Sequence, residues 1–310
     1  MINFRYHIVS LMAVFLALAV GIAVGVSLSP SLDKGILDQA GQDRDQVTAL
    51  RTELTRRDNL DTYRSTYDQR TAQAVLAGKM TEDRVALVVM PDAPSAVVTA
   101  VADAVAQAGG RVVSQVKVNQ EVFDATQADT VDAAVAALDV IGLTDQMSPA
   151  TKVGWCLSRA IAARSAGPRD TDAKTVGRTL AAAGLADVRE DDEDTAQLVI
   201  VITAATPAAS QAPTADVITA HVQLDVGLRD QSTDHIPVVV AGPNSAGLDG
   251  TDVGAVRTSS PASGELSTVD VADLPSGVVT TVLAGKEQLL GQQGHYGALA
   301  RADDALPTVR

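Results

Sequence analysis

The pattern of hydrophobic and polar positions begins with one uninterrupted apolar run. Residues 8–28 carry no charged side chain, and as a helix they would span roughly 31 Å, about the thickness of a hydrocarbon core. A cleaved signal peptide is the alternative. Its apolar region is typically about 7 to 15 residues long, and positions 27–30 form no small-x-small cleavage site. The pattern therefore predicts a retained transmembrane helix over 8–28.

The charges that flank this run predict its orientation. Arg5 and the α-amino group precede it with no acid between them, whereas Asp33 and Lys34 cancel on the far side. Positive charge on the N-terminal flank favours retention of that end in the cytoplasm. We therefore expect residues 1–7 to be cytoplasmic and the chain beyond the helix to be extracytoplasmic, in a single-pass arrangement in the cytoplasmic membrane.

A helical stalk is expected over 33–78, where charges of both signs are interspersed and no proline occurs. Apolar residues repeat there at 3-4 spacing in two series that differ in phase, which is typical of a short coiled coil with a stutter-like break. A single amphipathic helix packed against the following domain is the alternative. Small residues four apart in the apolar run also permit close helix packing, so we expect a homodimer through the transmembrane helix and the coil. The residues concerned are Val47, Leu50 and Leu54, then Leu60, Tyr63 and Tyr67, and in the apolar run Ala17, Gly21 and Gly25.

Gly78 ends the stalk, and a different kind of chain follows over 85–310. Continuous β-branched apolar runs are typical of strands buried on both faces, and a helical pattern at 95–110 separates the first two. This alternation predicts a three-layer α/β domain with a mostly parallel sheet and an antiparallel edge late in the chain. Strands are expected at 85–90, 111–118, 197–202, 237–241, 266–271 and 278–283.

The segment from about 125 to 187 fits this alternation poorly. It contains three helical patterns in succession, at 130–142, 148–166 and 172–186, which is more than one crossover between two strands requires. We expect a helical insertion that projects from the sheet. Insertions of this kind are where partner-binding surfaces tend to lie.

Composition and charge exclude several classes of function. The chain is 46% hydrophobic but only 3% aromatic, and Cys156 is its one cysteine, so neither an intrachain disulfide nor a thiolate metal cluster can form. From residue 85 onward 28 acids stand against 14 bases, which accounts for the whole net charge of −14. Such a domain would repel nucleic-acid phosphates. We expect no nucleic-acid partner, and Cys156 reads as a buried small hydrophobe.

Motifs that carry chemistry are not found. The sequence has no G-x-G-x-x-G after a strand, no Walker A motif and no G-x-S-x-G. The extracytoplasmic histidines, His221, His235 and His295, lack zinc-binding spacing. We therefore expect no catalytic, cofactor-binding or metal-binding residues and no enzymatic activity.

Two acidic loops are the remaining metal candidates. The acids at 190–194 lack the ligand spacing and turn glycine of a calcium loop and read as a solvated loop. His235 with the nearby acids Asp225, Asp230 and Asp234 leaves a weak metal site open as a minor alternative.

The two ends of the chain resemble a known family. The opening MINFRYHIVSLMAVFLALAVGIAVGVSL, the close GHYGALARADDALP and the preceding STVDVADLPSGVVTTVLAG are similar to the actinobacterial MctB-like "copper transporter" family. The middle agrees only in the order of its parts. The family name implies copper transport or copper resistance, although Met80, Met90 and Met147 are far apart in sequence and outline no copper relay.

The same family includes SteB-like septal proteins. That resemblance implies an extracytoplasmic domain similar to receiver or flavodoxin-like domains, whose helical insertion activates an NlpC/P60-type peptidoglycan endopeptidase in cell separation, together with a SteA-like membrane partner. Receiver phosphorylation is not expected, because Asp92 stands alone after the first strand and the run at 198–207 offers no acid. The leading hypothesis is a non-catalytic, septal membrane protein that activates this endopeptidase, and copper transport is the alternative.

Overall fold

The computed structural model describes the backbone of residues 4–28, 30–138, 140–165, 167–190, 193–206, 212–229 and 235–308. Contacts within the chain divide it into two units, Met1–Arg64 and Ser65–Arg310. Each unit is described by itself below.

The N-terminal unit is helical. Helix α1 covers Phe4–Leu28, and its apolar stretch Ile8–Gly25 is long and apolar enough to cross a membrane, as the hydrophobic run predicts. Helix α2 covers Pro30–Leu76, which confirms a long helix over most of 33–78. Gly78 follows its end with φ +74°, a backbone conformation that suits glycine. The pairing of these helices with a second copy stays a prediction.

The second unit contains a seven-stranded, mostly parallel sheet. Its strand order is β3-β2-β1-β4-β5-β6-β7. Every neighbouring pair is parallel except β2 and β3, which are antiparallel. The antiparallel edge therefore exists, but it lies in the middle of the sequence and not late in the chain. The strands are β1 Arg84–Val89, β2 Arg111–Val118, β3 Ala186–Glu190, β4 Leu198–Ile202, β5 Val238–Ala241, β6 Ser267–Val269 and β7 His295–Tyr296.

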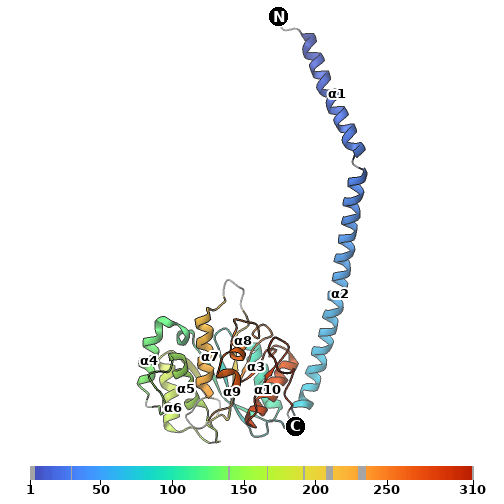
Figure 1. Ribbon diagram of the computed structural model, residues 1–310. Coiled ribbons are helices and arrows are strands. Elements are labelled where there is room, and N and C mark those ends of the chain that lie inside the picture. The colour runs from blue at the N-terminus through green and yellow to red at the C-terminus, as the bar shows by residue number, and fades with distance from the viewer. Residues whose placement is uncertain are drawn as a thin grey trace. The chain divides into compact units, whose positions relative to one another are not determined.

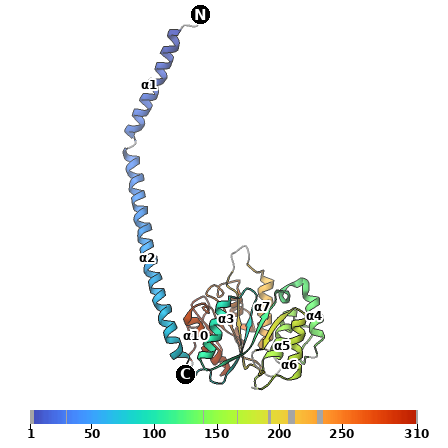
Figure 2. The same ribbon diagram turned by 180° about the vertical axis from the view of Figure 1, so that it is seen from behind.

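Helices cover both faces of this sheet and give three layers (Figures 1 and 2). One core lies between the sheet and helices α3 and α10, and the end of α2 contributes Leu76 to it. The other core lies between the sheet and α5, α7 and α8. Strand side chains alternate between the two cores because successive residues of a strand point to opposite faces. The helices are α3 Ser95–Gln107, α4 Ala128–Ala136, α5 Pro149–Ile161, α6 Thr171–Ala182, α7 Ala215–Arg229, α8 Asp252–Thr258, α9 Ala262–Glu265 and α10 Pro275–Leu289, with 3-10 turns η1 Gln120–Phe123 and η2 Ala125–Gln127.

The segment 125–187 is helical as expected, but it does not simply project from the sheet. Helix α5 carries an apolar face that is buried in the same core as the strands, with Val153, Leu157 and Ile161 fully buried. It packs closely against α7. Helix α5 is therefore one of the helices that cover the sheet, and the expectation of a projecting insertion is wrong for this helix.

The strand expected at 278–283 is also wrong, because these residues form the middle of α10. Pro275 occupies the first turn of that helix, where its missing N–H is tolerated. Val278, Val282 and Gly285 recur at helical spacing and face the core. An added Cβ at Gly285 would lie 2.6 Å from Leu198 on β4. The β-branched composition of this run suits a strand, but the close helix–sheet packing decides its structure.

Candidate functional site

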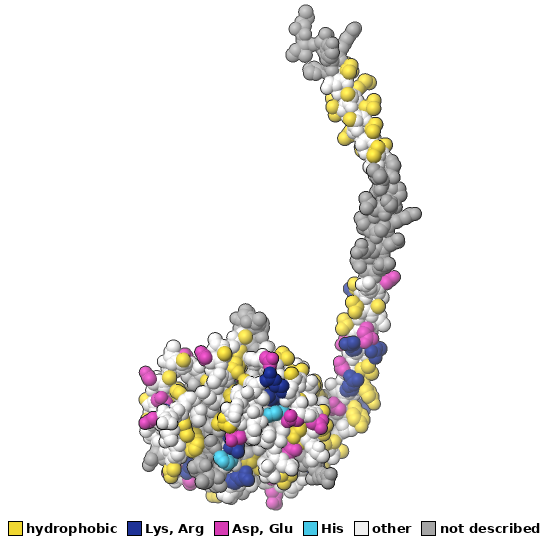
Figure 3. Space-filling view, viewed as in Figure 1, with side chains coloured by type: hydrophobic (Ala, Val, Ile, Leu, Met, Phe, Trp, Pro, Cys, Tyr) yellow, Lys and Arg dark blue, Asp and Glu magenta, His cyan; other side chains and the backbone are white. Residues whose placement is uncertain are grey.

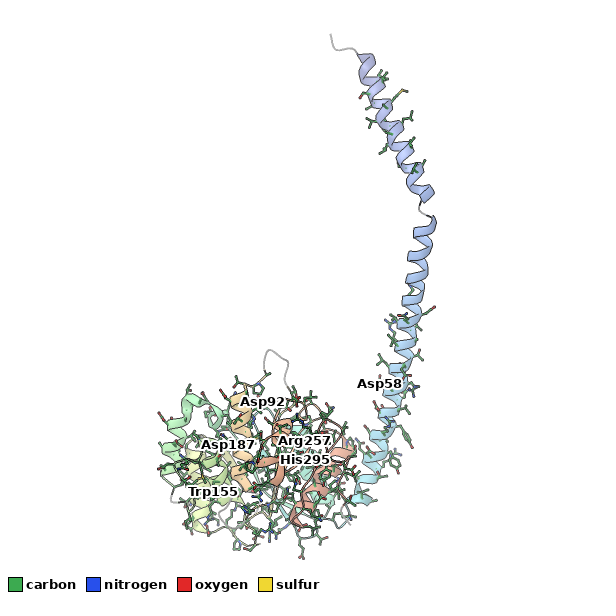
Figure 4. The ribbon with its side chains drawn as sticks, in the orientation of Figure 1. Asp58, Asp92, Trp155, Asp187, Arg257 and His295 are labelled. Carbon is green, nitrogen blue, oxygen red and sulfur yellow. The ribbon has the colours of Figure 1, made fainter. Side chains whose placement is uncertain are left out.

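The loop between α4 and α5 presents a single large hydrophobic residue to solvent. Ile141 is 87% exposed, more than any other large hydrophobic side chain in the described part of the chain. Its carbonyl oxygen accepts a hydrogen bond from Trp155 Nε1 at 3.2 Å, and Trp155 itself is buried on α5 (Figure 4). The hydrogen bond from Trp155 therefore fixes the backbone of the loop, while the side chain of Ile141 remains exposed to solvent.

The local sequence explains this arrangement. Ser148 caps α5 by accepting a hydrogen bond from the Thr151 backbone N–H, and Pro149 occupies the first helical position. Gly142 has φ +95°, and a Cβ at that position would lie 2.5 Å from the Trp155 ring. Only glycine permits both this backbone conformation and so close an approach to the indole.

The sequence on either side of Ile141 is acidic. Between Lys117 and Lys152 the sequence has six acids and no lysine or arginine. Asp132 is engaged by Lys152, with 2.8 Å between its Oδ1 and the lysine Nζ. Acidic side chains are scattered over the α4 side of the domain in Figure 3. Positive charge around an apolar recess on a partner protein would favour its binding to this acidic stretch and to Ile141. The exposed acids of this stretch are Glu121, Asp124, Asp129 and Asp145.

A groove of about 310 Å³ lies over α7, between α5 and the α8–α9 segment. Its floor includes Val222 and Val226, and no charged residue lines it. Helices α5 and α7 cross closely beside it, because Gly154 and Gly227 carry no Cβ. A Cβ at Gly154 would lie 2.2 Å from the Leu224 carbonyl oxygen.

Buried polar groups lie on α7 and at the start of α8. His221 Nδ1 is 2.7 Å from Asp252 Oδ1, and the Phe123 ring packs edge-on against the histidine, with 4.3 Å between ring centroids. Asp225 follows His221 by one helical turn and is 1% exposed. Burial and the nearby Asp252 carboxylate both raise the pKa of Asp225 well above its usual range.

Buried hydrogen bonds and an ion pair connect α8 with the C-terminal motifs at the β6–β7 edge of the sheet. Arg257 Nη1 donates to Asp270 Oδ2 at 2.7 Å, and neither side chain is exposed. Asp270 also accepts from the backbone N–H groups of Ala298 and Leu299. Gly297, with φ +138°, passes so close that a Cβ would lie 2.1 Å from Asp270 Oδ1. Asp270 and the backbone of 297–299 are thus held inside the domain, whereas Asp273, Arg301, Asp303 and Asp304 of the same motifs are exposed.

His295 belongs to the same network (Figure 4). Its Nε2 is 3.0 Å from the Ser263 carbonyl oxygen, which can only accept, so Nε2 carries the hydrogen. Its Nδ1 then accepts from the Thr268 hydroxyl at 3.0 Å. Burial lowers the pKa of His295, and the charge of Arg257 adds to this, although Asp303 opposes it. The neutral ring thus satisfies both of its nitrogens.

The residues that copper chemistry would use lie apart. Met80 belongs to the core under α3 and α10, whereas Met90 belongs to the core on the opposite face of the sheet. Cys156 is fully buried, and burial raises the pKa of its thiol to about 12. Within the described residues, no three histidine, cysteine or acidic side chains are placed to hold a metal ion.

The structure tests the predictions for the two acidic loops only in part. Asp194 is not a solvated residue, because its Oδ2 lies 2.9 Å from Arg84 Nη1 and 3.5 Å from Arg111 Nη2. Asp191, Asp192 and the side chain of Glu190 lie outside the described residues, so the prediction of a solvated loop is not tested there. His235 is exposed, whereas Asp225 is buried on α7; Asp230 and Asp234 lie outside the described residues. Asp92 is exposed after β1 with φ +60°.

Comparisons with known proteins agree with one another. The family model described as "Copper transport outer membrane protein, MctB" matches residues 1–307. Two similar relatives are the proteins named "Copper transporter MctB" of Mycobacterium tuberculosis (strain H37Rv) and Mycobacterium bovis. Each is 29% identical to this chain over 320 residues, which is 96% of either chain.

Proposed function

Because the chain belongs to the MctB family, we propose that it is a non-catalytic, single-pass membrane protein whose α/β domain binds and activates an NlpC/P60-type peptidoglycan endopeptidase in cell separation. The N-terminus is inside, the domain is extracytoplasmic, and the protein acts at the septum beside a SteA-like membrane partner. The observation that carries the proposal is the exposed Ile141 on a loop held in place by Trp155. A side chain that is left uncovered on an ordered loop suits recognition of another protein.

The fold supports a role as a binding scaffold. Without the antiparallel edge strand and β7, the order β2-β1-β4-β5-β6 corresponds to the 2-1-3-4-5 order of flavodoxin-like domains. In this chain β4 is followed by Thr203, a buried residue that is no phosphate acceptor of the receiver type. In this proposal the receiver-like architecture holds in place the α4–α5 surface, meaning the α4–α5 loop with Ile141 and the acidic stretch beside it.

The stalk supports a dimer in this proposal. Leu50 and Leu54 are 63% and 59% exposed on α2, and Tyr63 and Tyr67 are 67% and 58% exposed. Such side chains on an otherwise charged helix suit burial against a second copy. A homodimer would present two α4–α5 surfaces to its partners.

The test uses the full chain in detergent micelles with the purified endopeptidase. Deletion of the whole helical segment 129–187 is not a suitable test, because it would remove the buried helix α5 and unfold the domain. Point substitutions are therefore used. We expect Ile141→Ser to weaken endopeptidase binding at least tenfold and to abolish its activation in a peptidoglycan-cleavage assay. Leu290→Ser is the matched control, since Leu290 is 62% exposed at the end of α10, and α10 covers the opposite face of the sheet from α5. Absence of binding by the wild-type chain would refute the proposal.

Copper transport is the second candidate, and the name carried by the relatives favours it. Calorimetric titration of the full chain with Cu(I) and Cu(II) separates the two proposals. A dissociation constant well below about one micromolar would support a copper site. Weaker binding would leave copper without a resident site on this chain.

A further inference from the structure

Asp225 is a buried carboxyl group without a polar partner. It is 1% exposed, and neither of its carboxyl oxygens has a hydrogen-bond partner within the described residues. A buried ionised carboxylate without a partner is strongly unfavourable, so the protein must either neutralise this group or compensate its charge.

The nearest polar groups do not compensate it. Asp252, at the start of α8, already accepts from His221 at 2.7 Å, and its charge repels a charge on Asp225. His221 is further enclosed by the Phe123 ring. The local electrostatics therefore oppose ionisation of Asp225.

The elements that pack against α7 supply no counter-charge either. On α5 the thiol of Cys156 stays neutral, because burial raises its pKa to about 12, and strand β5 has no titratable side chain. The cations of α5, α7 and α8 are each engaged by another acid, and η1 adds only one more acid, the exposed Glu121. The engaged pairs are Lys152–Asp132, Arg159–Asp170, Arg229–Glu265 (with Glu265 on α9) and Arg257–Asp270.

We propose that Asp225 holds a proton at neutral pH and that this proton is the condition for α7 to pack against α8. Loss of the proton places a second negative charge beside Asp252 in the core. Water must then enter, or α7 must move away from α8. Both helices line the uncharged groove, so the groove changes when the proton leaves. This inference is independent of the proposed function.

The direction of the pH dependence follows from linkage. The pKa of Asp225 is raised above its value in the unfolded chain, about 3.9. The native chain therefore binds more protons than the unfolded chain between the two pKa values, and stability falls as pH rises. The contribution is fully present below the unfolded pKa and is lost as pH rises through the folded one.

The experiment measures urea unfolding of the full chain in detergent micelles between about pH 5 and pH 9. Trp155 is the only tryptophan and lies on α5, which packs against α7, so its fluorescence reports the unfolding. We expect the folding equilibrium constant of the wild type, relative to Asp225→Asn, to fall with pH by up to about tenfold per unit, the limit for one proton. Asp216→Asn, an exposed acid on the same helix, should follow the wild type. Parallel curves for wild type and Asp225→Asn would overturn the proposal.

A second measurement does not depend on any variant. Infrared spectra of the wild-type chain with isotope-labelled aspartate should show the carbonyl band of a protonated carboxylic acid at neutral pH, which disappears at high pH. A neutral-pH spectrum without this band would also overturn the proposal. If Asp225→Asn fails to fold, this spectrum decides.

Discussion

Arg257 Nη1 lies 2.7 Å from Asp270 Oδ2, and both side chains are wholly shielded from water. The other donors of Arg257 reach Thr268 Oγ1 at 2.8 Å and the Tyr296 carbonyl oxygen at 2.8 Å. The pair thus joins α8 to β6 and to the C-terminal segment. This packing explains the buried residues of the C-terminal motifs, Asp270 and Tyr296 among them.

Asp270→Asn should strongly destabilise the domain. It leaves the Arg257 guanidinium buried without its counter-charge, which typically costs about 3 to 5 kcal/mol. Urea unfolding of the full chain, followed by Trp155 fluorescence, measures the change. Asp249→Asn is the control, because Asp249 is an acid whose side chain is 88% exposed and should change stability by less than about 0.5 kcal/mol. Equal effects of the two substitutions would contradict this role of the ion pair.

Gly154→Ala should separate α5 from α7. The new Cβ would lie 2.2 Å from the Leu224 carbonyl oxygen, and backbone cannot yield as a flexible side chain does. Overpacking of this kind costs about 1 to 3 kcal/mol. Gly264→Ala is the control, since nothing lies within 4 Å of its added Cβ. Thermal unfolding of both variants tests the prediction, and an unchanged Tm in Gly154→Ala would refute it.

His295 should make the domain less stable in acid. Its pKa is lowered in the folded state, mainly by burial, whereas the unfolded value is about 6.5. The unfolded chain therefore binds more protons below that value, so stability is full above about pH 6.5 and is lost as pH falls through the folded pKa. His295→Gln should be less stable than the wild type at pH 7, because the ring's hydrogen bonds are lost, yet its unfolding midpoint should fall less between pH 7 and pH 5. An equal fall in both proteins would exclude His295 as the cause.

The sequence predicted the parts of the fold that depend on composition over several residues. Continuous apolar runs identified β1, β4 and β5 correctly, because strands buried on both faces need no polar positions. Strand β2 was also predicted, although its sequence alternates with polar residues and it is only partly buried. The same rule failed at α10, where Val278 and Val282 are buried by helix–sheet contacts that local composition does not reveal. The two-residue strand β7 is too short for any periodic signal.

The candidate site was harder to predict from sequence. The helical segment was recognised, but Ile141 gave no signal, because its exposure depends on the Trp155 hydrogen bond and on the conformation of Gly142. The burial of Asp225 was equally hidden, since an acid in a helix is usually at the surface. A tertiary contact decides each case, and no local pattern encodes it.

The positions of the apolar residues on α2 predict which of them lie at the interface, or seam, between two copies of the stalk. Tyr63 follows Leu50 by 13 residues, and at about 100° per residue the two side chains point roughly 140° apart around the helix. One straight interface cannot include both. If the second copy packs on the membrane-proximal series, Leu50→Cys should form a disulfide dimer under mild oxidation and Tyr63→Cys should not. The native Cys156 is fully buried, so wild-type chain provides the background. The reverse pattern would move the seam to the tyrosine series, and dimers from neither position would refute a parallel dimer through α2.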